Sequence, residues 1–292
     1  MAVTTSRELI ARRHSQVRVD GWERAAFLVS GLLAAVSAVA AGATFFVPDV
    51  LRGTAVMNGS ARGTALVMLV AGVPLLLAAM YLASRGSTRA RIAWLGLSGY
   101  FAYNGVMFVI ATPFNQLYLL YEAVLALAFW TGVLVLRSID LGLLGRAFSV
   151  SFPRRSIAVY TLAIVGLNTF VWLSGAVPAA LSTTAPRVLD GTGLTTVPTY
   201  DQDLAFWLPL IGVAAVWMWR HIELGRLIVG AALVMWVVEG VGVAVDQWMG
   251  GAADPSSTVA SAAMTPAFAA LALIGLVPLY FYMRSLHEMP RP

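Results

Sequence analysis

Eight long apolar stretches set the strongest limit on what this 292-residue chain can fold into. A helix that crosses the roughly 30 Å hydrocarbon core of a bilayer needs about 20 mostly apolar residues. The stretches that meet this requirement lie near 25–47, 64–84, 91–112, 116–136, 156–178, 203–219, 226–248 and 260–283. Because lipid offers no partner for a free backbone amide, only helices and closed barrels span it. The sequence therefore predicts an all-α, polytopic membrane protein with eight transmembrane helices.

The composition excludes several classes of protein. The chain is 59% hydrophobic and 11% charged, whereas a soluble domain carries about 25% charged residues. It has no cysteine, which excludes disulfides, thiolate metal sites and cysteine nucleophiles. Every basic residue is an arginine, so no lysine is present to form a Schiff base. An ordinary water-soluble enzyme and a retinal-type pigment are both excluded.

The arginines predict the orientation of the helices. Cytoplasmic loops of membrane proteins retain positive charge. If the N-terminus is cytoplasmic, all of the 19 basic residues fall on the inner side except Arg52, Arg62 and Arg187. We therefore expect both termini in the cytoplasm. Because the arginines are scattered over several segments, the lipid bilayer is the expected partner and nucleic acid is not.

The chain divides into a membrane domain with two short flanks. Residues 1–24 form the predicted cytoplasmic N-terminal segment, in which 5–8 resembles a capping box that opens a short interfacial helix. The transmembrane domain covers 25–284, and 285–292 form a cytoplasmic tail. Two connections are longer than the rest. The inner one, 137–155, contains an interfacial stretch at 141–148, and the outer one, 178–202, is either a lid or a flexible connector.

The two halves of the chain resemble each other weakly. At an offset of 135 residues, 69–110 aligns with 204–245 without a gap, and Asn104 aligns with Glu239. This pattern is typical of a parallel 4+4 repeat, a type known in transporters, although chance matches between Ala- and Leu-rich helices explain it equally. The alignment also pairs Pro74 with Pro209, and each is expected to kink its helix because proline removes a backbone hydrogen bond.

A few polar side chains lie inside the predicted helices. Such groups are costly in lipid, so they usually face the bundle interior and mark function. From the 1.5 Å rise per residue, Asn104, Glu122, Asn168 and Glu239 lie roughly 9 to 14 Å below the outer surface. With their neighbours they predict an outward-facing acidic pocket that is closed on the cytoplasmic side. The candidate pocket residues are Tyr100, Tyr103, Asn104, Tyr121, Glu122, Asn168, Asp203, Glu239 and Asp246.

These carboxylates have no lysine, arginine or histidine at their predicted depth. Either they are protonated, or a cation from outside completes the site. Plainer interpretations remain open for individual residues. On this interpretation, Asn104 and Asn168 only form a hydrogen bond to a neighbouring helix, and Asp203 caps the start of a helix.

Catalytic signatures are mostly missing from the sequence. It contains no H-E-x-x-H, no G-x-S-x-G and no phosphate-binding G-x-x-x-x-G-K-[ST] motif. The three histidines, His14, His221 and His287, fall on the predicted cytoplasmic side, where His221 and Glu223 are interpreted as a solvated helix end. We expect no metal site and no cofactor, and an enzyme is the less favoured interpretation.

Three functions remain open. The leading hypothesis is an integral membrane protein that binds or transports a small cationic or polar solute through the acidic pocket, with proton coupling through Glu239 or Glu122 left open. The first alternative is a non-catalytic membrane subunit or scaffold, as a homo-oligomer or with a partner subunit. The second is a membrane enzyme acting on a lipid or lipid-linked substrate. Heavy use of Ala, Gly, Arg and Val indicates GC-rich codons, which favours a bacterial plasma (inner) membrane.

Overall fold

The structure is a computed structural model that describes residues 6–184 and 186–288, and this part of the chain is all-α and 80% helical. It contains eight helices that are long and apolar enough to cross a membrane. They are Gly21–Phe46, Ala55–Ser84, Thr88–Ile110, Tyr118–Ser138, Arg154–Ala180, Pro198–Trp219, Glu223–Ala253 and Ala262–Arg284. The predicted all-α class and the eight apolar spans are confirmed. A multi-pass membrane protein follows from them.

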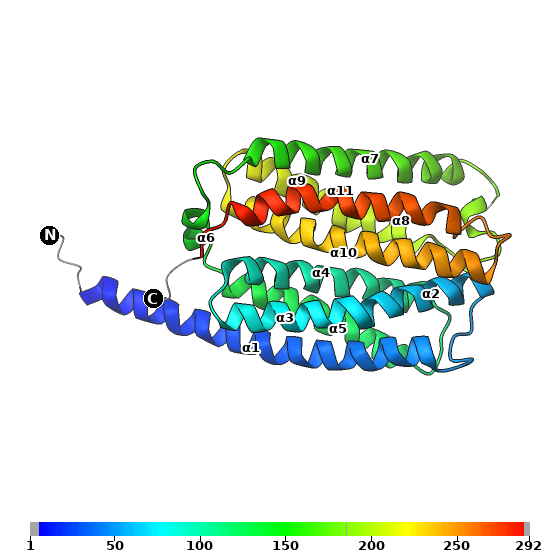
Figure 1. The fold of residues 1–292 in the computed structure, drawn as a ribbon, viewed down its shortest axis with the longest axis horizontal. Helices are drawn as coiled ribbons and strands as arrows, with labels where there is room; N and C mark the ends of the chain where they lie inside the picture. The colour runs from blue at the N-terminus through cyan, green and yellow to red at the C-terminus, as the bar shows by residue number, and fades with distance from the viewer. Residues whose placement is uncertain (1–5, 185, 289–292) are drawn as a thin grey trace.

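The spans are assembled from the α-helices labelled in Figure 1 and from short π-helical turns within them. The first four comprise α1 (Ser6–Phe46), α2 (Ala55–Val67), η1 (Met68–Gly72), α3 (Val73–Ser84), α4 (Thr88–Ile110) and α5 (Tyr118–Ser138). The other four comprise α7 (Arg154–Ala180), α8 (Pro198–Gln202), η3 (Asp203–Trp207), α9 (Leu208–Trp219), α10 (Glu223–Ala253) and α11 (Thr265–Arg284). The short elements between spans include α6 (Leu141–Ala147) and η2 (Arg187–Leu189), and η4 (Ala262–Met264) begins the eighth span.

The first helix is longer than its membrane span. Residues predicted to form a separate interfacial helix belong instead to the start of α1, which runs without a break for 41 residues. Its beginning projects past the other helices, and it lies at the same end of the bundle as the end of α11 (Figure 1). Thr5, the first residue of the predicted capping box, lies outside the described residues.

Helices α4 and α10 form the centre of the bundle. Helix α10 packs against α2, α4, α9 and α11, while α4 also packs against α3 and α5. Glycine permits the closest of these approaches, since a Cβ atom at Gly96 would overlap the carbonyl oxygen of Ala231 and one at Gly63 would lie 2.8 Å from the Cα of Asp246. Small residues at such crossings are what allow membrane helices to approach closely. By contrast, α7 buries only Ile157, Ala158 and Thr161.

The helices around the two predicted kinks contain widened turns. Pro74 and Pro209 each follow a π-helical turn, η1 and η3 respectively. A proline cannot donate to the carbonyl four residues earlier and its ring clashes with it, and a π-helical turn accommodates that defect. The first residues of η1 and η3, of α3 and α9, and of α4 and α10 each differ by 135 positions.

The two long connections contain short helices. The inner one forms α6, close to the predicted stretch 141–148, at the end of the bundle where α7 and α10 begin (Figure 1). The chain after α11 pairs with it, because the Ser149 amide donates to Ser285 O and the His287 amide to Ala147 O, each at 2.8 Å. The outer connection contains η2, which is followed by Gly191 with a φ of 72°.

Replacing Gly96 with alanine tests the packing of α4 on α10. We expect Gly96→Ala to lower the stability of the purified protein by about 1–3 kcal/mol, because overpacking a tight contact forces the backbones apart. Thermal unfolding in detergent measures the effect. Gly166→Ala in α7 is the matched control, since a Cβ atom there meets nothing within 4 Å. Equal midpoints for the two variants would show that α4 and α10 do not approach as described.

Candidate functional site

The centre of the site is a hydrogen bond between two helices. The Asn104 side-chain amide, on α4, donates to Glu239 Oε2, on α10, at 2.7 Å and to the carbonyl oxygen of Tyr100 at 3.0 Å. Asn104 is buried, with 3% of its surface exposed. The sequence alignment of the two halves pairs these two residues, and in the structure they touch.

Tyr100 places an unpaired hydroxyl beside this pair. Its side chain is fully buried, and its hydroxyl has no hydrogen-bond partner. Glu239 lies close enough for its negative charge to act on Tyr100. Two glycines make room around its ring. A Cβ atom at Gly72 would lie only 2.8 Å from the ring, whereas one at Gly242 would sit 3.9 Å from Glu239 Oε2 and 4.0 Å from the ring. Gly242 therefore leaves a methyl-sized space between the carboxylate and the tyrosine.

Asp203 opens the widened turn η3 and is held by aromatic donors. The Trp172 indole, on α7, donates to Asp203 Oδ2 at 2.9 Å, and the Tyr103 hydroxyl also hydrogen-bonds this carboxylate. Each donor packs on a second aromatic ring, since the Trp172 and Tyr200 centroids are 4.9 Å apart and those of Tyr103 and Trp207 are 6.2 Å apart. The Asp203 carboxylate is thus held by hydrogen bonds from two aromatic side chains, Trp172 and Tyr103.

Asp246 lies further along α10 and faces α2. Ser60, Thr64 and Gln247 hydrogen-bond its carboxylate. The negative charges of Asp246 and Asp203 both act on Glu239. We call Tyr100, Tyr103, Asn104, Asp203, Glu239 and Asp246 the central polar cluster.

Within residues 6–184 and 186–288, no basic side chain pairs with the carboxylates of the cluster. The ion pairs there are Arg89–Glu288, Arg91–Glu23 and Arg226–Glu223. The same residues contain no group of three His, Asp or Glu side chains arranged to hold a metal ion. The charges of Asp203 and Asp246 act on Glu239, but the three carboxylates do not form such a metal-binding group.

Three predicted residues lie in other contacts. Glu122 accepts a hydrogen bond from Tyr118 of its own helix at 2.7 Å. Tyr121 shares a hydrogen bond with Thr44 at 2.8 Å and stacks on Phe108. The Asn168 amide donates to the Ile164 carbonyl of its own helix at 2.9 Å. Their similar predicted depth in the membrane grouped these residues with Glu239 in the sequence analysis. Depth alone does not show which side of each helix faces a neighbouring helix.

Several partners of the cluster were missed in the sequence. Ser60 and Thr64 are four residues apart on α2, yet the predicted span began only at 64. Trp172 follows Asn168 by four residues on α7, but this spacing does not show that Asp203 accepts its hydrogen bond. The Gln202 side-chain nitrogen, beside Asp203, is buried without a partner.

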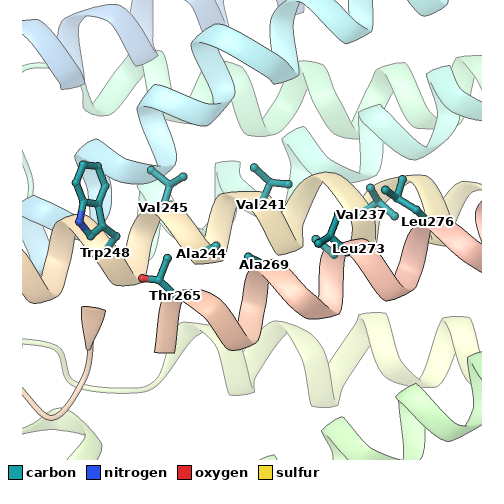
Figure 2. Close-up of a pocket in the computed structure, with 10 residues that line it drawn as sticks. Val237, Val241, Ala244, Val245, Trp248, Thr265, Ala269, Leu273 and Leu276 are labelled. Atoms are coloured by element: carbon teal, nitrogen blue, oxygen red, sulfur yellow. The ribbon is translucent and has the colours of Figure 1, made fainter. Parts of the chain in front are cut away.

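A separate apolar groove lies between α10 and α11. It has a volume of about 410 Å³ and includes Val241, Trp248, Thr265 and Leu273 in its lining. Figure 2 shows the side chains of the two helices around it. None of the nine predicted pocket residues lines this groove. It is therefore distinct from the central polar cluster.

Comparisons with known proteins leave the site to be interpreted on its own geometry. No family model, no curated protein and no solved structure matches the chain.

Exchanging Asn104 and Glu239 tests their contact. We expect Asn104→Glu alone to destabilise the protein by about 1–3 kcal/mol or more, because two buried carboxylates would face each other. The double variant Asn104→Glu/Glu239→Asn should recover most of that loss, as measured by thermal unfolding in detergent. Asn168→Glu, with and without Glu239→Asn, is the control for which no recovery is expected. A double variant no more stable than Asn104→Glu would contradict the contact.

Proposed function

We propose that the protein binds a small cationic or polar solute at the central polar cluster and carries it across its membrane. The observation that carries the proposal is the unpaired Tyr100 hydroxyl beside the Glu239 carboxylate, next to the space left by Gly242. A buried carboxylate inside a membrane is costly unless something compensates its charge. Asn104 donates one hydrogen bond to the Glu239 carboxylate, and a bound cation supplies the remaining compensation of its charge.

The surroundings favour a positive charge. Asp203 and Asp246 add negative potential at Glu239, and no resident cation of the described chain pairs with them. The rings of Trp172 and Tyr103 stand beside Asp203, and aromatic faces attract cations. An ammonium group or a monovalent metal ion fits this setting.

The arrangement of the carboxylates favours a single charge over a divalent metal. Calcium takes six to eight oxygen ligands, several of them carboxylates, and the carboxylates here do not form such a group. One carboxylate, one hydroxyl and a methyl-sized space suit a small monovalent ion, a protonated amine or a proton. If a proton and the cation exchange at Glu239, the transport of one is coupled to the transport of the other.

The widened turns flank the cluster on two sides. Gly72, at the end of η1, borders the ring of Tyr100, and η3 begins with Asp203. In many transporters the substrate lies where two helices are interrupted in corresponding positions of two repeats. We propose that the halves are a parallel 4+4 repeat, supported by the 135-residue spacing of η1 and η3 and by the Asn104–Glu239 contact. The exchange variant tests this equivalence.

The orientation is also proposed. The arginine pattern favours cytoplasmic termini, and the predicted depth of the polar side chains favours an outward-facing cluster. The heavy use of Ala, Gly, Arg and Val favours a bacterial inner membrane.

Because the chain has no cysteine, single cysteines report its orientation directly. We expect Thr183→Cys, exposed in the outer connection, to react with a membrane-impermeant maleimide in intact cells. Val150→Cys, exposed beside α6, should react only after lysis. The reverse pattern would place the opening of the cluster on the cytoplasmic side.

Glu239→Gln tests solute binding. We expect the wild-type protein in detergent to bind Na⁺ or methylammonium, measured by calorimetry, and Glu239→Gln to weaken that binding at least about tenfold, since a charge-assisted contact is lost. Glu122→Gln is the matched control, because Glu122 bonds only within its own helix in this structure. It should bind as the wild type does. Binding that is equal in all three proteins, or absent from all of them, would refute the proposal.

One observation favours the first alternative, a non-catalytic subunit. Helix α11 and most of α7 are exposed, and the apolar groove lies beside α11. Such surfaces contact either lipid or a partner helix. If the wild type, Glu239→Gln and Glu122→Gln bind the cation equally or not at all, the non-catalytic subunit becomes the favoured function. The lipid-modifying enzyme gains nothing from the geometry, because Glu122 and Glu239 have no contact in common.

A further inference from the structure

A cluster of three arginines and one histidine lies where α7 and α10 begin. We call Arg154, Arg155, His221 and Arg226 the basic cluster. Arg154 Nη1 lies 2.6 Å from His221 Nδ1, and Arg154 is repelled by the charges of Arg155 and Arg226. The carboxylate that acts on Arg154 is that of Glu223, which already pairs with Arg226 at 2.9 Å. Positive charge therefore exceeds negative charge at this point.

Arg226 is held rigidly in this cluster. Its guanidinium lies 5.2 Å from the ring centroid of Phe148 and 6.0 Å from that of Phe152. Only 11% of its side chain is exposed. The Nε atoms of Arg226 and Arg154 are buried without hydrogen-bond partners. Arginines that serve insertion topology alone need no such burial, and Arg137 on the same predicted side is exposed.

Two long helices begin at the basic cluster without capping side chains. Pro153 precedes α7 and Ile222 precedes α10, and neither side chain accepts a hydrogen bond from the first turn. The first backbone amides of a helix point outward, and its dipole favours negative charge there. The bond between Arg154 and His221 ties the start of α7 to the turn before α10. The starts of α7 and α10 are thus joined at the basic cluster.

His221 has an unusual backbone conformation. Its φ is 65°, in the left-handed region that favours glycine. The corresponding turn between α3 and α4 contains Gly86, with a φ of 93°. A side chain retained under such strain is a reason to look for function. Here its unprotonated Nδ1 accepts a hydrogen bond from Arg154 and so positions that guanidinium.

We propose that the basic cluster binds the phosphate group of an anion, either a phospholipid headgroup or a soluble phosphate compound. Guanidinium groups match phosphate oxygens with paired hydrogen bonds, and helix starts bind the same groups through backbone amides. This site is independent of the central polar cluster and of the solute proposed there.

Binding by the full-length, delipidated protein tests the proposal. Native mass spectrometry compares phosphatidylglycerol with phosphatidylcholine, and thermal shift at constant ionic strength measures the effect of inorganic phosphate against chloride. We expect selective binding in at least one arm, and the arm that responds identifies the source of the phosphate. Arg154→Gln should weaken it at least about tenfold, because a hydrogen bond to a charged group is lost.

Two further variants separate binding from folding. Arg137→Gln removes an exposed arginine from the same predicted side and should bind as the wild type does. His221→Gly relieves the backbone strain, so it should fold at least as stably as the wild type and yet bind more weakly. The proposal is overturned if neither arm responds, if Arg137→Gln loses as much binding as Arg154→Gln, or if both Arg154→Gln and His221→Gly bind normally.

Discussion

The structure depends on how a carboxylate is held inside an apolar bundle. Glu239 lies in the middle of α10, and the compensation visible there is the amide of Asn104 on α4. That bond requires α4 and α10 to cross closely, and Gly96 permits the crossing. Beside this crossing, the Tyr100 hydroxyl is buried without a hydrogen-bond partner among the described residues. The close packing of α4 on α10 and the unpaired Tyr100 hydroxyl therefore occur at the same place in the bundle.

The surrounding elements follow from that crossing. The widened turn η1 ends at Gly72, which makes room for the Tyr100 ring, and η3 presents Asp203 to Trp172. Widened turns next to polar side chains are frequent at functional sites. Helices α7 and α11 contribute less to the packing and remain largely exposed. The polar interior therefore lies between α2, α4, η3 and α10, while α7 and α11 form much of the exposed apolar periphery.

The all-α class and the eight spans were predictable because hydrophobic length is a local signal. Eight stretches of about 20 apolar residues require no knowledge of tertiary contacts. The site was predictable in part. Asn104 and Glu239 were singled out because polar groups in lipid are rare, but Glu122 and Asn168 passed the same test and bond within their own helices. The rotation of each helix about its axis decides this difference, and helices with nearly uniform apolar composition contain little information about that rotation.

The central claim is that Glu239 takes its compensating charge from outside the chain. Infrared difference spectra between acid and alkaline conditions measure it most directly, in the wild type and in Glu239→Gln. The account predicts a band from a protonated buried carboxyl that is missing from Glu239→Gln and that changes when the bound cation is added. Identical spectra from the two proteins, or a band insensitive to every cation tried, would contradict it.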